Sequence, residues 1–188
     1  MKTILALLFF TLFCFNPKHK AQENNTSEKY GNTLNAGIAL GYFGYVGYNT
    51  PVLHLNYEIQ IHRNLTIAPF ISFYRYNHSY YWGNHNYPYK YYNYSETVIP
   101  IGAKVTYYFD ELLHASSKWD FYLAGSLGFT IRRTVWESDY YGETMVRGGT
   151  GYLYLDLHIG TEYHFNNRLG MFADLSSGMS TLGLAFHL

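Results

Sequence analysis

The sequence predicts an all-β protein, an eight-stranded antiparallel up-and-down transmembrane β-barrel. Eight segments alternate large apolar residues with small or polar residues, which is the period of a strand with two different faces. The uniformly apolar face is the one that carries large residues, and an apolar N-terminal run precedes all eight segments. At 188 residues the chain has the size of a single domain. No apolar run reaches the roughly 18 residues that a membrane-spanning helix needs.

The N-terminus has the order of a secretory signal peptide. Lys2 precedes the apolar run Ile4–Phe15, and a polar stretch then leads to Ala21. We therefore predict a signal peptide over 1–21, a flexible lead-in over 22–32 and the barrel over 33–188. A short buried helix is the alternative for the apolar run, but Asn16 and Pro17 stop it. The only cysteine, Cys14, lies inside this segment, so no disulfide is expected in the exported chain.

The first four predicted strands show one continuous apolar face each. A helix would need apolar residues at steps of three and four, which these segments lack. In chain order, the predicted outward residues are Leu34, Ala36, Ile38, Leu40 and Tyr42 in 34–43; Leu53, Leu55, Tyr57, Ile59 and Ile61 in 52–61; Leu65, Ile67, Ile71 and Phe73 in 65–76; and Ile99, Ile101, Ala103, Val105, Tyr107 and Phe109 in 97–109.

The last four predicted strands follow the same rule, and 152–163 is the clearest of the eight. Segments of about ten residues are long enough to cross a bilayer when the strands tilt. The predicted outward residues are Phe121, Leu123, Leu127, Phe129 and Ile131 in 121–132; Leu153, Leu155, Leu157 and Ile159 in 152–163; Leu169, Met171, Ala173 and Leu175 in 169–176; and Leu182, Leu184, Phe186 and Leu188 in 180–188.

The connections between these strands predict the two ends of the barrel. The connections 62–64, 110–120 and 166–168 lie at one end together with both termini. The connections 44–50, 77–96, 134–150 and 177–179 lie at the other end. Pro69 and Pro100 interrupt the third and fourth strands, and because proline cannot donate to a ladder, we expect a β-bulge at each.

The two faces distinguish a membrane barrel from a soluble one. Large apolar side chains suit a wall that faces lipid, whereas glycine, alanine, serine and paired charges suit a narrow interior. A soluble barrel or sandwich is the alternative, and it leaves the inward charges unexplained. Aromatic residues, 20% of the chain, fall toward both ends of the apolar face as two interfacial girdles. The predicted interior charge network consists of Glu58, Lys104, Arg132, Asp156, Glu162 and Asp174.

The segments 121–132, 155–172 and 180–188 carry a resemblance to a known family. They resemble the small eight-stranded outer-membrane β-barrel proteins of Gram-negative bacteria. The resemblance covers most of the exported chain, and it rests on patterns rather than on fixed residues. It implies insertion by the barrel assembly machinery, contact with outer-membrane lipid, and an outer-membrane location with periplasmic termini.

The densest local feature is the tyrosine-rich segment 74–94, with nine tyrosines, one tryptophan and two histidines. Tyrosine-rich loops provide large, stiff and amphipathic binding contacts, so an extracellular protein or glycan ligand is conceivable. The alternative is a structural hairpin in which strands three and four continue past the membrane and the tyrosines pair across it. The candidate binding residues are Tyr80, Tyr81, Trp82, Tyr87, Tyr89, Tyr91 and Tyr92.

Other chemistry is weakly indicated. His78 and His85 lack a second ligand at a strong metal spacing, and His54, His158 and His187 point inward from non-adjacent strands. We therefore predict no metal site and no cofactor. Zero net charge excludes a nucleic-acid partner held by a general basic field.

The predicted function is an integral outer-membrane barrel with a structural or surface-interaction role. The first alternative is a narrow pore for small solutes or ions. The second alternative is a lipid-modifying enzyme, for which Asp174, Ser176 and His158 are the loose catalytic candidates. We predict no enzyme, because Asp174 and His158 are expected at different heights and no nucleophile–base pair is fixed.

Overall fold

The computed structural model describes residues 31–110, 112–142 and 153–188, apart from 42–49. The signal peptide, most of the lead-in, and the aromatic positions Tyr42 and Tyr152 lie outside the described residues. The described residues form eight strands, β1 to β8, that close into one antiparallel barrel in chain order. Among them, no helix is long and apolar enough to cross a membrane.

The strands agree with the predicted segments and extend several of them. Their bounds are β1 (Thr33–Gly41), β2 (Thr50–His62), β3 (Leu65–Asn84), β4 (Tyr87–Tyr108), β5 (Trp119–Trp136), β6 (Leu153–Asn166), β7 (Leu169–Ser176) and β8 (Met179–His187). Pairing of β1 with β8, from Thr33 opposite His187 to Gly41 opposite Met179, closes the barrel. The closed ladder leaves no open sheet edge, which a lipid environment requires.

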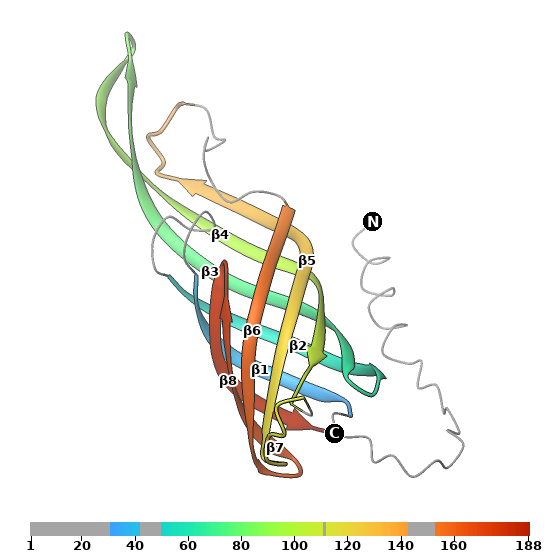
Figure 1. Cartoon of the computed structure of the whole chain (residues 1–188). Helices are drawn as coiled ribbons and strands as arrows, with labels where there is room; N and C mark the ends of the chain where they lie inside the picture. Colours follow the sequence, from blue (N-terminus) through green and yellow to red (C-terminus); the bar gives the residue numbers. More distant parts are fainter. Residues whose placement is uncertain (1–30, 42–49, 111, 143–152) are drawn as a thin grey trace.

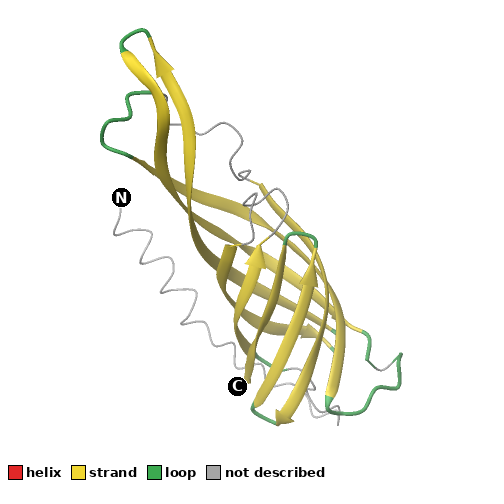
Figure 2. Cartoon of the chain, turned by 90° about the vertical axis from the view of Figure 1, so that its left-hand side faces the viewer, coloured by secondary structure: helices red, strands yellow, loops and turns green. Residues whose placement is uncertain are grey.

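The two ends of the barrel differ as predicted. The turn end carries the short turns 63–64 and 167–168, the connection 109–118, and the start of β1 beside the end of β8. At the opposite end, β3 and β4 run far beyond the other strands and meet in the two-residue turn His85–Asn86 (Figure 1). We call 76–94 of this pair the hairpin. Figure 2 shows it projecting away from the C-terminus.

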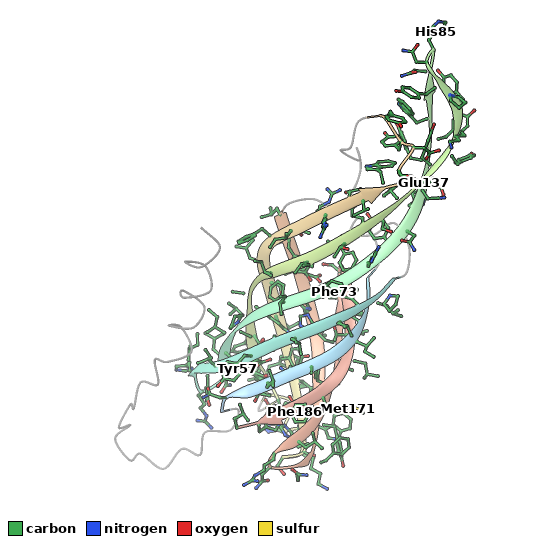
Figure 3. The ribbon with its side chains drawn as sticks, turned by 180° about the vertical axis from the view of Figure 1, so that it is seen from behind. Tyr57, Phe73, His85, Glu137, Met171 and Phe186 are labelled. Atoms are coloured by element: carbon green, nitrogen blue, oxygen red, sulfur yellow. The ribbon has the colours of Figure 1, made fainter. Side chains whose placement is uncertain are left out.

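The outer wall of the barrel is apolar. All eight strands contribute exposed outward apolar residues, including Leu53 at 60%, Leu157 at 69% and Leu182 at 57%. Such exposure of a continuous apolar band suits lipid rather than water. Tyr57 and Phe73 lie on this wall (Figure 3). At the turn end, Tyr163 contacts both Trp119 and Phe165, and the three rings form part of an aromatic girdle.

The inner face holds the core. Tyr108, Tyr122 and Phe172 point inward and are buried, as are most of the polar residues of the same face. Glycine makes room for these rings: a Cβ at Gly160 would lie 2.2 Å from the Tyr122 ring, and one at Gly183 would lie 2.6 Å from the Phe172 ring. The small residues of the inward face therefore leave the space that the large inward side chains occupy.

The predicted bulges at Pro69 and Pro100 are wrong. Pro69 stays in register with Ala103 and Pro100 with Thr130, and neither ladder shifts there. The register shifts lie instead beside turns, at Gln60/His62, Trp82/Asn84 and His164/Asn166. Each proline lacks an N–H group and therefore leaves out one ladder hydrogen bond, but neither strand contains an extra residue there.

The outward position of Leu155 leads to a test of the lipid-facing wall. Leu155→Arg places a charge in the apolar band and should lower the free energy of unfolding by about 2–4 kcal/mol. Urea unfolding in lipid vesicles measures this. Leu112→Arg, in the 109–118 connection where Leu112 is 73% exposed, is the matched control and should change little. Equal tolerance of the two substitutions would place Leu155 in water.

Candidate functional site

The centre of the barrel interior is an ion pair. Lys104 on β4 lies 2.5 Å from Asp174 Oδ2 on β7, and both side chains are buried. The Tyr122 hydroxyl donates to the same oxygen at 3.3 Å, and the lysine ammonium sits 5.0 Å from the centre of the Tyr122 ring. A buried charge needs this kind of pairing and additional hydrogen bonding to remain ionised.

A second chain of contacts ends on the other oxygen of Asp174. His158 Nδ1 lies 2.9 Å from Asp174 Oδ1, and His158 Nε2 lies 2.8 Å from Ser126 Oγ. The expectation that Asp174 and His158 stand at different heights is therefore wrong. Asp174 pairs with Gly160, two residues after His158 on β6, and the tilt of the strands brings the Asp174 and His158 side chains into contact. Ser126, on β5, was not among the catalytic candidates.

Ser126, His158 and Asp174 have the hydrogen-bond order of a hydrolytic triad. That order activates a serine only when a substrate carbonyl can reach it. Ser126 is 3% exposed and Asp174 also holds Lys104, so the described contacts make these residues part of the interior packing. Ser176, the predicted serine, bonds Asp156 instead at 2.8 Å.

The remaining predicted charges are satisfied in different ways. Glu58 accepts hydrogen bonds from Tyr108 at 2.7 Å, Thr66 at 2.8 Å and Asn35 at 3.0 Å. Asp156 accepts hydrogen bonds from the Ser177 hydroxyl at 2.6 Å and the Gly178 N–H at 2.9 Å, and so fixes the β7–β8 turn. Of the six predicted charges, only Lys104 and Asp174 pair with each other.

Arg132 pairs with a residue that the sequence analysis left out. Its Nε lies 2.5 Å from Glu96 Oε1, and the Tyr76 hydroxyl donates to Glu96 Oε2 at 2.8 Å. Glu96 is fully buried and lies on the inward face of β4. The alternation of β4 would have revealed Glu96 if the predicted strand had begun one residue before 97.

Glu162 lies near the turn end of the interior, beside two histidines. Its Oε1 is 2.8 Å from His187 Nε2 and 3.8 Å from His164 Nδ1. His164 was missed because the predicted strand ended at 163, although 164 continues the inward positions of β6. His54 and His158 lie elsewhere in the interior, so the three inward histidines of the prediction do not form one cluster.

The hairpin is built as a paired ladder. Tyr80 stands opposite Tyr92, Tyr81 opposite Tyr91, and His78 opposite Tyr94. The alternative reading of the tyrosine-rich segment as a hairpin is therefore what the structure contains. His85 sits at its tip (Figure 3), whereas His78 pairs with Tyr94, several ladder positions before the turn, so these two histidines do not share a site.

One face of the hairpin is packed. Trp82 contacts Tyr92 at 5.9 Å and Tyr140 at 5.2 Å between ring centres, and Tyr87 stacks on Tyr141 at 4.7 Å. Tyr92 is 1% exposed. The segment 137–142 thus supports the hairpin, and three of the seven candidate residues, Trp82, Tyr87 and Tyr92, contribute mainly to its rigidity.

The opposite face of the hairpin is open. Tyr81, Tyr89 and Tyr91 are 55%, 66% and 68% exposed, and Tyr81 contacts both of the others. We call these three residues the tyrosine row. Nearby, Lys90 forms a salt bridge with Asp139, and this hydrogen bond raises the pKa of Lys90 and lowers the pKa of Asp139.

A groove of about 530 Å³ lies at the base of the hairpin. Amide, hydroxyl and aromatic groups of β3 and β4 line one side, and the end of β5 contributes Trp136. Glu137, the residue after β5, also lines the groove and lies near the point where the hairpin leaves the barrel (Figure 3). Glu137 accepts the Asn93 N–H at 2.9 Å, and the Tyr94 and Trp136 rings are 4.7 Å apart. The groove therefore joins flat apolar surface to polar hydrogen-bonding groups.

The interior ion pair predicts a large effect of losing one partner. Lys104→Met leaves the buried Asp174 carboxylate without its cation and should lower the free energy of unfolding by about 3–5 kcal/mol. Urea unfolding in vesicles measures the loss, and the double change Lys104→Met with Asp174→Asn should recover part of it. Lys90→Met, at the exposed pair, is the control and should change unfolding far less. Equal effects would mean that water reaches Lys104 freely.

The triad-like geometry gives a separate prediction. A fluorophosphonate probe should leave Ser126 unlabelled in the folded barrel, because the serine is enclosed. Mass spectrometry of the treated protein checks this, with Ser126→Ala as the blank. Labelling of the folded protein that disappears in Ser126→Ala would establish a reactive serine.

Comparisons with known proteins agree on the fold. No protein-family model and no curated protein sequence matches the chain. Among solved structures, the chain is similar to Ail, the attachment invasion locus protein of Yersinia pestis, in complex with the heparin analogue sucrose octasulfate. The identity is 12%, the coverage is 82% of this chain and 95% of that one, and the TM-score is 0.50.

Neisserial surface protein A, NspA, is similar to the same degree. The identity is 14%, the coverage is 84% of this chain and 96% of that one, and the TM-score is 0.50. Similarity at this level establishes the fold, and the apolar outer wall agrees with it. The chain therefore has the fold of the small eight-stranded transmembrane β-barrels.

Proposed function

We propose that this chain is an integral outer-membrane protein whose barrel anchors the hairpin at the cell surface, where it binds an extracellular partner. The apolar outer wall and the aromatic girdle support the location, and the signal peptide predicted from the sequence agrees with it. Insertion by the barrel assembly machinery follows from that location. The single observation that carries the binding role is the exposed tyrosine row on a hairpin that extends beyond the other strands of the barrel.

The tyrosine row has the properties of a prepared binding surface. Its three rings are held side by side by cross-strand pairing, and the packed face of Trp82, Tyr92 and Tyr140 stiffens the hairpin behind them. A pre-ordered aromatic surface loses little conformational entropy when a partner binds. Aromatic rings in water without a partner are otherwise an aggregation hazard.

The groove favours a saccharide as that partner. Sugar rings stack on aromatic faces, while their hydroxyls bond to amides, hydroxyls and carboxylates of the kind that line the groove. Ail is described with a sulfated sugar analogue. The Glu137 carboxylate in the present groove would repel a sulfated sugar, so a neutral saccharide fits better. An extracellular protein is the other occupant that the binding test can reveal.

The interior argues against the pore alternative. Tyr108, Tyr122 and Phe172 fill the inside of a barrel whose eight strands leave space only for side chains. The Lys104–Asp174 pair crosses the same space. We therefore expect no steady single-channel steps in planar bilayers.

The proposed orientation is tested with epitope tags. A tag between His85 and Asn86 should be reached by antibody on intact cells, because the hairpin turn would face outward. A tag between Asn167 and Arg168, at the turn end, should be reached only after the outer membrane is opened. The reverse labelling pattern would invert the orientation and remove the surface-binding role.

The binding role is tested on a glycan array with the barrel in nanodiscs. The triple change Tyr81→Ala, Tyr89→Ala and Tyr91→Ala should lower binding at least about tenfold, since each exposed ring contributes of order 0.5–1.5 kcal/mol. Phe165→Ala, an equally exposed ring at the turn end, is the matched control. Saccharide binding that survives the triple change, or none by the unchanged protein, would contradict the saccharide role; binding to cell-surface protein alone would identify the other occupant.

A further inference from the structure

The turn end of the barrel interior contains a compact set of metal-ligand groups. Glu162 and His164 lie on β6, and His187 lies on β8, so the set spans β7. One donor atom from each residue lies within 4.8 Å of the others. The two imidazole rings stack with 4.9 Å between their centres, and the Glu162 carboxylate reaches toward both.

The outer nitrogen of each histidine is already engaged. His164 Nε2 lies 2.6 Å from Asp120 Oδ2, and His187 Nδ1 lies 3.0 Å from Thr33 Oγ1. A carboxylate only accepts, so His164 donates to Asp120 from Nε2, and in the neutral ring Nδ1, on the side of Glu162, is the nitrogen that can ligate a metal. Metal-ligating histidines show this arrangement, in which the second ring nitrogen donates to a carboxylate or other acceptor that fixes the ring.

Two inner atoms of the set, one on Glu162 and one on His187, lack hydrogen-bond partners. Glu162 Oε1 and His187 Nε2 are buried and make no hydrogen bond, although they are only 2.8 Å apart. The two atoms therefore do not point at each other. This geometry is expected of two metal ligands that both point at one ion. The Glu162 side chain is only 6% exposed, so leaving its oxygen unpaired would be costly.

We propose that Glu162, His164 and His187 bind a divalent transition-metal cation, with Zn²⁺ as the best chemical fit. Two imidazole nitrogens and one carboxylate oxygen form a common zinc donor set. Two donors that each lie ~2.1 Å from one ion are at most ~4.2 Å apart. The separations of 2.8 Å and 3.8 Å around Glu162 Oε1 fit this limit.

The place of this site in the fold indicates what the ion does. His187 is the last residue of β8 and pairs with Thr33 at the start of β1, where the barrel closes. An ion held by β6 and β8 would join strands on both sides of β7 beside that seam. Both histidine side chains are partly exposed, at 18% and 15%, so the ion and a completing water can enter from the turn end.

The test uses the full chain refolded in detergent, titrated with Zn²⁺ against a competing chelator. We expect one ion per barrel, and a more than ~100-fold loss of affinity in His164→Gln and in His187→Gln. Asp120→Asn, which alters only the outer partner of His164, should weaken binding about 10- to 100-fold. His62→Gln, an exposed histidine at the same end, is the control and should bind as the unchanged protein does.

Three further measurements separate binding from misfolding. A Cβ at Gly170 would lie 2.2 Å from Glu162 Oε1, so Gly170→Ala should displace the carboxylate and weaken Zn²⁺ while all three ligands remain. Gel mobility before and after boiling confirms that each variant is folded, and bound Co²⁺ should show visible absorption bands that His187→Gln lacks. Equal Zn²⁺ affinity in His164→Gln, His187→Gln and the unchanged protein would overturn the site and leave an ion pair.

Discussion

Closure of the ladder between β1 and β8 is the constraint on which the rest of this structure depends. In lipid every backbone polar group must be paired within the protein, and a closed barrel is how strands achieve this. Closure also divides every strand into an outward and an inward face. Once the outward face is committed to lipid, each charged residue of a membrane-spanning strand has to find its partners in a confined interior. The polar contacts of the interior are thus a consequence of the outer surface.

Inside the barrel, the charged residues find their partners in several separate groups of contacts rather than in one network. Glu58 is satisfied by neutral donors, Asp174 by Lys104 and His158, and Glu96 by Arg132 and Tyr76. The bulky residues Tyr122 and Phe172 occupy the space between these groups because Gly160 and Gly183 stand opposite them. Ser126, His158 and Asp174 belong to these interior contacts, because Asp174 holds Lys104 as well as His158 and Ser126 is buried.

Period-two alternation predicted the barrel, its strand order and the direction of nearly every described strand residue, because lipid and lumen impose opposite chemistry on neighbouring positions. It did not predict where the strands end. Glu96, Asp120 and His164 all lie one residue outside a predicted strand, and each is an inward residue with an ionic partner. Past the membrane boundary the outward face is no longer required to be apolar, so the signal that marks a strand fades while the strand continues.

Alternation also did not predict which interior residues pair with one another. Alternation assigns Lys104, Arg132 and Asp156 to one face, but it carries no information on height, which depends on strand tilt and register. For the same reason, the sequence did not show which tyrosines of the hairpin are packed and which are exposed. A tyrosine count identifies an aromatic segment, yet only the register shows that Tyr92 packs inward while Tyr91, its neighbour, points to solvent.

The hairpin and the barrel are stabilised by separate means, and this separation explains how one chain can combine a fixed anchor with a binding surface. The barrel relies on closure, lipid contact and interior pairing. The hairpin relies on ring contacts among Trp82, Tyr92 and Tyr140 and on the Lys90–Asp139 salt bridge, all of them beyond the lipid-facing wall. Changes to Tyr81, Tyr89 or Tyr91 touch neither set of contacts. A surface with that freedom can be reshaped toward a partner without cost to the fold that carries it.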